Sequence, residues 1–259
     1  MSTHEPSVAS RPPETLVFSL QDAIHSDSSD VLKAAASDPA LSEDLALVLL
    51  KRNDLAAEVL EPLSKNATVA KSRKVKIAIV GHPKTPRYVS MALVRQLFTF
   101  DLMWVALTPI VPGDVKHAAE EVLINRMEAI SSGERLSLAR QASGRVAGAL
   151  LLDLEPRVIR AALENPRLTD TLVIRALMRA DPPAELVHAV CHHPKWSLRR
   201  EVRIALLRNE HTPLARALEF SRSLPPALLR EILQNSRLPA NIKTCLLKKR
   251  MTDDETRSQ

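Results

Sequence analysis

Four residues of metal-ligand type lie close together between residues 188 and 193: His188, Cys191, His192 and His193. On a helix, His188 and His192 share one face, and each could offer an imidazole nitrogen to a metal ion. No carboxylate or second cysteine completes a ligand set at a metal-site spacing. The pattern favours a helix end with histidines near its carbonyl groups, so we expect no metal site and no cofactor.

Basic residues recur in two stretches that both have helical periodicity. They are the candidate partner-binding residues: Lys71, Arg73, Lys74, Lys195, Arg199, Arg200 and Arg208. Such side chains can bind phosphates or an acidic protein surface, and the alternative is an ordinary solvated face. For Lys76 and Arg203 we favour a structural role, in which the side chain packs along a stack of helices and bonds carbonyls or acids between repeats.

The charge of the chain is uneven along its length. The net charge is +6, and residues 31–123 hold 12 basic and 10 acidic residues, against 17 and 8 in residues 158–250. This difference favours an acidic partner for the second stretch. Aromatic residues make up only 3% of the chain, so any nucleic-acid binding would depend on phosphate contacts instead of base stacking.

The composition predicts helices as the elements that carry these residues. Five glycines stand against 18 prolines, and leucine, alanine, valine and isoleucine supply most of the apolar side chains. Proline is tolerated in the first turn of a helix, and Ser, Thr, Asp or Asn before it can cap the free amides. We therefore expect each proline to start a helix, and about 14 to 15 short helices in all.

An internal similarity organises these helices. Residues 31–123 align with residues 158–250 without a gap, so that Val31 lies on Val158. The pairs that match include Pro39 with Pro166, Asp54 with Asp181, Thr85-Pro86 with Thr212-Pro213, and Pro112 with Pro239. We interpret this as a tandem duplication of a helical array.

The predicted organisation has six parts. They are a disordered segment (1–12), an N-terminal capping helix (13–30), a first half-solenoid (31–123), a linking helix pair (124–157), a second half-solenoid (158–251) and a disordered tail (252–259). A solenoid has to cover its first apolar face, which is the role we expect for the capping helix.

Short strings in the second stretch resemble known helical repeats. The segments AALENPRLTDTLVIRAL and LLRNEHTPLARAL look like leucine-rich-repeat-variant units, while EVRIALL and EPRVIRAAL are similar to part of a HEAT repeat. The resemblance implies an all-α fold, an α–α superhelix or solenoid, whose stacked helix pairs share one apolar seam and present a concave face to a partner. The iron–sulfur segment of some variant-repeat proteins would need clustered cysteines, and the two cysteines of this chain, Cys191 and Cys245, are far apart in the sequence.

Several packing expectations follow from this interpretation. A helix over residues 197–207 should bury Leu198, Val202, Ala205 and Leu206, and Leu172 should be a second buried leucine of the seam. Trp196 should anchor a turn. Cys191 and Cys245 are expected to be buried free thiols of a reducing compartment.

We therefore expect a non-catalytic scaffold that binds a protein with an acidic surface through its concave face. The alternative is a nucleic-acid binder that uses the basic second half. A remote alternative is a HEAT-like DNA glycosylase, because such enzymes use an acid beside aromatics, and Asp101 precedes Trp104. No phosphate-binding loop, nucleophile elbow or paired-carboxylate motif occurs in the sequence. The absence of a leader pattern and of an apolar run long enough to span a bilayer predicts a soluble, cytoplasmic protein that does not enter membranes.

Overall fold

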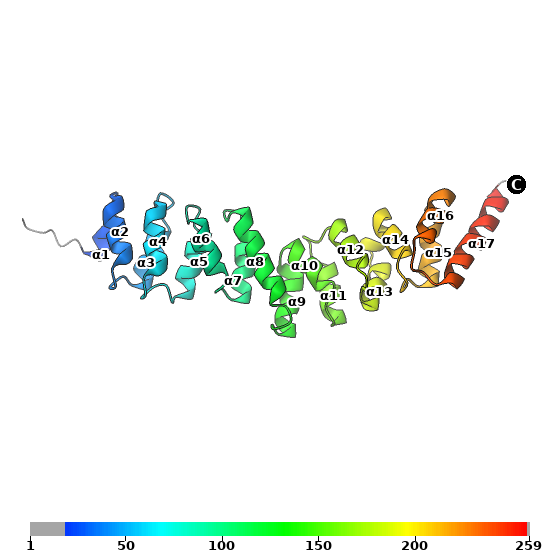
Figure 1. Cartoon of the computed structure of the whole chain (residues 1–259), viewed down its shortest axis with the longest axis horizontal. Coiled ribbons are helices and arrows are strands. Elements are labelled where there is room, and N and C mark those ends of the chain that lie inside the picture. The colour runs from blue at the N-terminus through cyan, green and yellow to red at the C-terminus, as the bar shows by residue number, and fades with distance from the viewer. Residues whose placement is uncertain (1–18, 258–259) are drawn as a thin grey trace, which may run out of the picture. The chain divides into compact units, whose positions relative to one another are not determined.

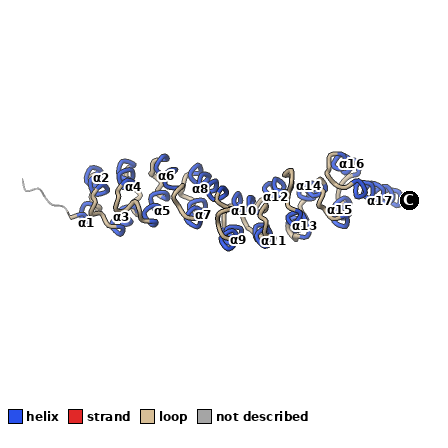
Figure 2. The backbone as a smooth tube through the Cα atoms, turned by 60° about the horizontal axis from the view of Figure 1, so that its bottom comes forward, coloured by secondary structure: helices blue, strands red, loops and turns tan. Residues whose placement is uncertain are grey.

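Helices are the regular elements of this chain. The computed structural model describes residues 19–257, and the side chains up to residue 249. Those residues form seventeen α-helices and one 3₁₀ helix, and none of them is in a strand (Figure 1, Figure 2). The all-α prediction is confirmed. The expected number of helices was too low, because several helices contain only four to eight residues and their apolar patterns are too short to separate by eye.

The chain divides into two compact units, Met1–Ser90 and Met91–Gln259. The helices of the first unit are α1 (Leu20–Ala23), α2 (Ser29–Ser37), α3 (Glu43–Leu50), α4 (Ala57–Lys65) and α5 (Arg73–Gly81). Helix α6 (Arg87–Val94) contains the boundary. The predicted disordered segment 1–12 and residues 13–18 of the predicted capping helix lie outside the described residues. Within the rest of that predicted helix, α1 covers only Leu20–Ala23, and α2 begins at Ser29.

The second unit holds the remaining elements. They are α7 (Thr99–Leu107), α8 (Gly113–Asn125), α9 (Ser132–Gln141), α10 (Gly144–Leu150), α11 (Pro156–Leu163), α12 (Asp170–Leu177), α13 (Ala184–His192), η1 (Trp196–Leu198), α14 (Arg200–Leu207), α15 (Leu214–Arg222), α16 (Pro226–Gln234) and α17 (Ala240–Arg257). Helix α17 thus continues into residues 252–257, for which the sequence predicted a disordered tail.

Many of the helices pack against the helix that comes two positions later in the chain. In the first unit, α2 packs on α4 and α3 on α5. In the second unit, α9, α11 and α13 form one row, and α8, α10, α12, α14 and α16 form the other (Figure 1, Figure 2). A helix such as α10 or α11 therefore has neighbours in its own row and another across the two rows.

The helix ends follow local sequence rules in part. Ser42, Ser72 and Ser143 each cap a helix by accepting a backbone N–H, as expected for serine at this position. Pro156 and Pro226 occupy the first helical turn. The expectation that each proline at a helix boundary starts a helix is only partly right, because Pro39 and Pro166 lie in turns before α3 and α12, which begin at Glu43 and Asp170.

Side-chain donors connect helices of the same row. Each donor bonds a backbone carbonyl at or near the end of a helix 25 to 33 residues earlier in the chain; the donors are Arg52, Asn66, His82, Arg126, Asn165, Trp196, Asn209 and Arg216. The last carbonyls of a helix have no partner inside that helix. We call these contacts the inter-helix carbonyl bonds, and they fix where one helix sits on an earlier one.

Arg52 illustrates how one such donor can make several hydrogen bonds at once. Its Nη1 atom donates to the carbonyls of Ile24 and Ser26 at 3.1 and 2.8 Å, after α1. Its Nε and Nη2 atoms hold Asp54 at 3.2 and 2.8 Å. The hydrogen bond from Arg52 lowers the pKa of the Asp54 carboxyl to about 2. The arginine therefore joins the ends of α1 and α3.

The burial pattern corrects two packing expectations. Leu206 is fully buried, but Leu172 is only half-buried. The expected helix over residues 197–207 is divided at Arg199 into η1 and α14, and Leu198 is 69% exposed. Val202 and Ala205 are buried as expected, because they follow the break and lie on the inner face of α14.

Two glycines allow helices α10 and α12 to approach each other. A Cβ atom at Gly144 would lie 2.3 Å from the carbonyl oxygen of Arg167, and one at Gly148 would lie 3.3 Å from the Leu172 side chain. A Cβ atom at Gly133 in α9 would meet nothing within 4 Å. The need for glycine at residue 144 is thus imposed by a neighbouring backbone and not by a turn.

We predict that Gly144→Ala lowers the free energy of unfolding by about 1 to 3 kcal/mol, since the backbone near Arg167 has to move. Gly133→Ala is the matched control. It adds a methyl group in open space within a helix, so it should raise stability by about 0.5 to 1 kcal/mol. Urea unfolding of both variants measures the difference, and equal effects would contradict the close approach.

Candidate functional site

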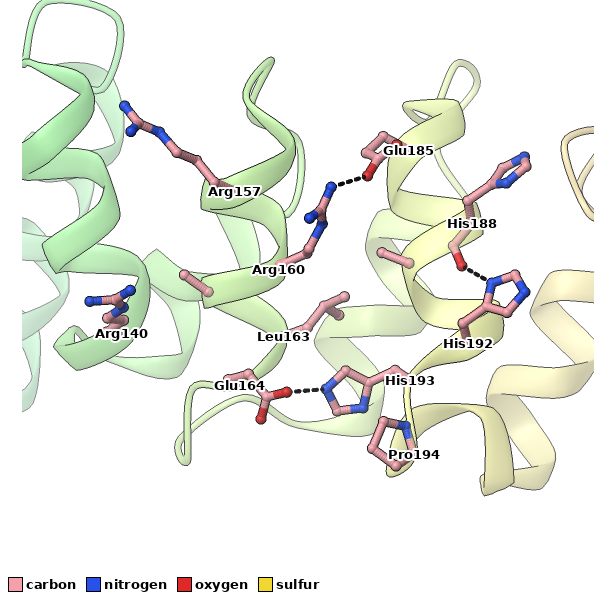
Figure 3. A pocket seen from close by; sticks show the side chains of 12 residues that line it. Arg140, Arg157, Arg160, Leu163, Glu164, Glu185, His188, His192, His193 and Pro194 are labelled. Carbon is pink, nitrogen blue, oxygen red and sulfur yellow. Dashed lines mark hydrogen bonds and ion pairs between the residues drawn. The ribbon is translucent and has the colours of Figure 1, made fainter.

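A hollow in the second unit lies between α9, α11 and α13 (Figure 3). It has a volume of about 700 Å³, and we call it the α11–α13 groove. Its lining consists of Arg140, Arg157, Arg160, Ala161, Leu163, Glu164, Glu185, His188, Ala189, His192, His193 and Pro194. Charged and imidazole groups therefore surround a floor of small apolar side chains.

Helix α11 places its arginines on the open side of the groove because the opposite face of the helix is buried in the core. Val158, Ile159 and Ala162 are buried on the inner face. Arg160 lies on the outer face and donates through Nη2 to Glu185 at 3.1 Å (Figure 3). Arg157 donates through Nε to Glu155 at 2.8 Å. Both ion pairs are partly exposed, and Arg157 also donates through Nη2 to the Ser132 hydroxyl. Exposed pairs of this kind contribute little to stability.

The third arginine of the groove comes from the last turn of α9. Arg140 is exposed and has no ionic or hydrogen-bond partner among the residues that the structure describes. Its charge is therefore available to a ligand without breaking an existing pair.

His188, His192 and His193, which the sequence predicts near the carbonyl groups of a helix end, form one wall of the α11–α13 groove. His192 directs Nδ1 toward the carbonyl of His188 at 2.8 Å, which confirms the expected contact with a helix carbonyl (Figure 3). His193 lies 3.1 Å from Glu164 through Nε2, while its Nδ1 atom accepts the amide of Lys195 at 3.1 Å. Across residues 19–249, no three His, Cys, Asp or Glu side chains are placed to share a metal ion.

Trp196 anchors the turn below this wall, as the sequence predicted. Its side chain is fully buried, and its indole N–H donates to the carbonyl of Leu163 at 2.9 Å. Lys195 places its ammonium group 3.9 Å from the centre of the Trp196 ring. The tryptophan holds the end of α11 in place and is not open to a ligand.

A second hollow, the α2–α4 groove, occurs in the first unit. Its volume is about 520 Å³, and its lining is Lys33, Ser37, Glu58, Glu61, Pro62, Lys65 and Asn66. The alignment of the two stretches carries every one of these positions onto a lining residue of the α11–α13 groove. Here Lys65 and Glu61 pair at 2.7 Å, and hydrogen bonds from Lys65 and Tyr88 lower the pKa of the Glu61 carboxyl.

Two of the candidate basic residues form ion pairs with neighbouring helices of their own row. Lys74 on α5 lies 3.4 Å from Glu43, the first residue of α3. Arg199, just before α14, lies 3.9 Å from Asp170, the first residue of α12. The prediction of a basic helix is therefore only partly right, since Arg199 precedes the helix.

The other candidates lie apart from the two grooves. Arg73 and Arg200 are the first residues of α5 and α14, and Lys71 is exposed before α5. Arg208 follows α14 and is half-buried. In the second unit, α14 belongs to the row opposite α9, α11 and α13, so only Lys195 adjoins the α11–α13 groove.

The predicted structural role of Arg203 is correct in the kind of contact that the side chain makes. Its Nε atom donates to the Ser197 carbonyl at 2.6 Å, and its guanidinium group lies 5.5 Å from the Phe220 ring on α15. That carbonyl belongs to the preceding turn, however, and the bonds between repeats come from the donors described above. Lys76 is half-buried on α5.

Sequence reasoning missed Arg140, Arg157 and Arg160 as site residues. A signal was present, because Arg157, Arg160 and Glu164 follow the spacing of one helical face, as do Glu185, His188 and His192. Alignment of the two stretches also places Lys33 opposite Arg160. The sequence alone does not show that α9 packs beside α11, and this packing brings Arg140 to the groove.

The two cysteines occupy different environments. Cys191 is fully buried on α13, and burial raises the pKa of its thiol to about 12. Cys245 on α17 is only half-buried, so the expectation of two buried thiols is correct for one of them. Both are free thiols.

Comparisons with protein-family models, with curated proteins and with solved structures each find no match for this chain. Among the helices that the structure describes, none is both long enough and apolar enough to cross a bilayer. The geometry of the grooves is therefore the basis for a functional proposal.

We predict that a thiol reagent such as DTNB modifies one cysteine of the folded protein quickly, and that this cysteine is Cys245. Cys191 should react only after unfolding, because its thiol is inaccessible and remains protonated at neutral pH. The variant Cys245→Ser is the control and should show no fast reaction. A fast reaction in Cys245→Ser would show that α13 opens readily.

Proposed function

We propose that this chain is a non-catalytic helical-repeat scaffold that binds a partner protein, built as an internally duplicated α-solenoid of HEAT-like or leucine-rich-repeat-variant units. Two kinds of regularity support the duplication. The first is the position of the helices, and the second is the hydrogen bonding at their ends.

The helix bounds repeat with the spacing found in the sequence. When residues 31–123 are laid on residues 158–250, α3, α4 and α7 coincide at both ends with α12, α13 and α16. The first residues of α5, α6 and α8 coincide in the same way with those of α14, α15 and α17. Repeated lengths of helix and turn favour repeated structural units.

Individual hydrogen bonds repeat as well. Thr85 donates to the Ile79 carbonyl at 2.6 Å, and Thr212 donates to the Leu206 carbonyl at 2.6 Å. Both threonines are buried, and each bond spans six residues. Lys116 and Lys243, which occupy corresponding positions of the two stretches, each donate to a carbonyl seven residues earlier. Such agreement in buried polar contacts supports common ancestry of the two stretches.

The observation that carries the scaffold proposal is the recurrence of a groove at the same positions in both stretches. Stacked helix pairs of a solenoid create extended surfaces on which partners bind. Here the backbone framework of the groove is kept, while its charged side chains differ. This is the pattern expected of a binding surface whose partner preference has diverged.

The alternative is nucleic-acid binding by the basic residues of the second stretch. We predict that duplex DNA and single-stranded RNA bind no tighter than the non-specific range of about 10⁻⁴ to 10⁻⁶ M at physiological salt. Filter binding at rising salt measures this. Tighter binding that falls steeply with salt, and that Arg199→Glu with Arg200→Glu weakens, would replace the scaffold proposal with the alternative.

The glycosylase alternative has its own test. Asp101 is buried, Trp104 is largely exposed, and Trp196 is a structural anchor. We expect no base release from alkylated DNA when protein and DNA are present in equal amounts. Release that depends on Asp101 would contradict the non-catalytic proposal.

A further inference from the structure

We propose that the α11–α13 groove binds an acidic segment of the partner protein, with Arg140, Arg157 and Arg160 as the groups that receive its carboxylates. This inference rests on the proposed scaffold function and adds the location and the chemistry of binding.

The charge of the groove is the first support. Its lining holds three arginines and two glutamates, with His188, His192 and His193 beside them. Arg140 is unpaired among the described residues, and Arg160 shares a single carboxylate contact at 3.1 Å. A ligand carboxylate can therefore bind bidentately to Arg140, whereas at Arg157 and Arg160 it would share the guanidinium group with Glu155 and Glu185.

The α2–α4 groove supplies an internal comparison with the same helix lengths. Its lining holds two lysines and two glutamates, which balance, and Glu61 is already paired with Lys65. His188 stands where the first stretch has Glu61, and each lines its own groove. Extending the same register by one residue places Asp30, which does not line the α2–α4 groove, opposite Arg157. The change from Glu61 to His188 removes a negative charge from the lining, so the electrostatic divergence of the two stretches includes the groove itself.

The floor of the groove favours a peptide over a nucleic acid. Ala161, Leu163 and Ala189 are apolar and small or buried, which suits an apolar side chain between two carboxylates. Glu164 and Glu185 line the same hollow. A peptide can place uncharged side chains beside these glutamates and its carboxylates at the arginines, whereas every unit of a phosphate backbone carries a negative charge. No Phe, Tyr or Trp side chain is among its lining residues to stack on a base.

The test is selection of a phage-displayed library of short random peptides on the full chain. We expect the enriched peptides to be rich in Asp and Glu. Fluorescence anisotropy of a labelled enriched peptide should show affinity reduced about tenfold or more by Arg157→Asp with His188→Glu, which installs the acidic residues, Asp30 and Glu61, that stand opposite them in the same register. Far-UV circular dichroism and urea unfolding check that the variant is folded.

Two matched variants sharpen this test. Arg199→Glu with Arg200→Glu reverses two charges on the opposite row and should leave peptide affinity unchanged. Asp30→Arg with Glu61→His makes the matching charge changes beside the α2–α4 groove, which has no counterpart of Arg140, and should create a weaker further binding site for the same peptide, detected as a second binding phase.

The failures of the two proposals are distinguishable. Peptides that bind with unchanged affinity to the groove variant would overturn the groove assignment and leave the scaffold proposal intact. Enrichment of peptides without acidic residues would do the same. If no peptide is enriched, and nucleic acid binds and is weakened by the groove variant, both proposals fall.

Discussion

The structure depends on a requirement at the ends of its short helices. A helix of eight or nine residues leaves about half of its carbonyls without an intrahelical partner, so the way these groups are satisfied decides how the helix is placed. In this chain, many of the last carbonyls accept a hydrogen bond from a side chain of the next helix in the same row. A buried carbonyl without a partner costs about 1 to 3 kcal/mol, which is large compared with the stability that one short helix adds.

The same residues also close the turns in which they lie. Asn66, Asn165 and Asn209 each accept the amide two residues ahead while their Nδ2 atoms donate backward to an earlier helix. His82 makes the same pair of contacts with its two ring nitrogens. One side chain therefore determines both the shape of a turn and its attachment to the previous repeat. The outward side chains are left unconstrained, and this allows the charges of the two grooves to differ on one framework.

The sequence predicts a large part of this architecture because helix starts and apolar faces are local properties. Ser42 before an apolar run and the shared Thr85-Pro86 and Thr212-Pro213 pairs indicate boundaries that the structure contains. The carbonyl bonds between helices are not local. Nothing in the sequence distinguishes Arg52, which joins two helix ends, from an exposed arginine such as Arg95, whose backbone carbonyl only accepts such a bond.

The candidate site was harder to predict for the same reason. The basic residues singled out from the sequence lie mostly in or just before the first turns of α5 and α14, where some pair with acids of the adjacent helix. The arginines that line the hollow come from α9 and α11, and their proximity depends on how these two helices pack. Leu198 shows a related limit, since a break of one residue between η1 and α14 turned a predicted core leucine toward solvent.

The most direct test of the role of the inter-helix carbonyl bonds is the free energy of unfolding of His82→Asn compared with His82→Ala. Asparagine occupies the corresponding position 209, where it donates to the last carbonyl of α12. The account predicts that His82→Ala loses about 1 to 3 kcal/mol and that His82→Asn keeps most of that stability. Equal losses in the two variants, or no loss in His82→Ala, would contradict it.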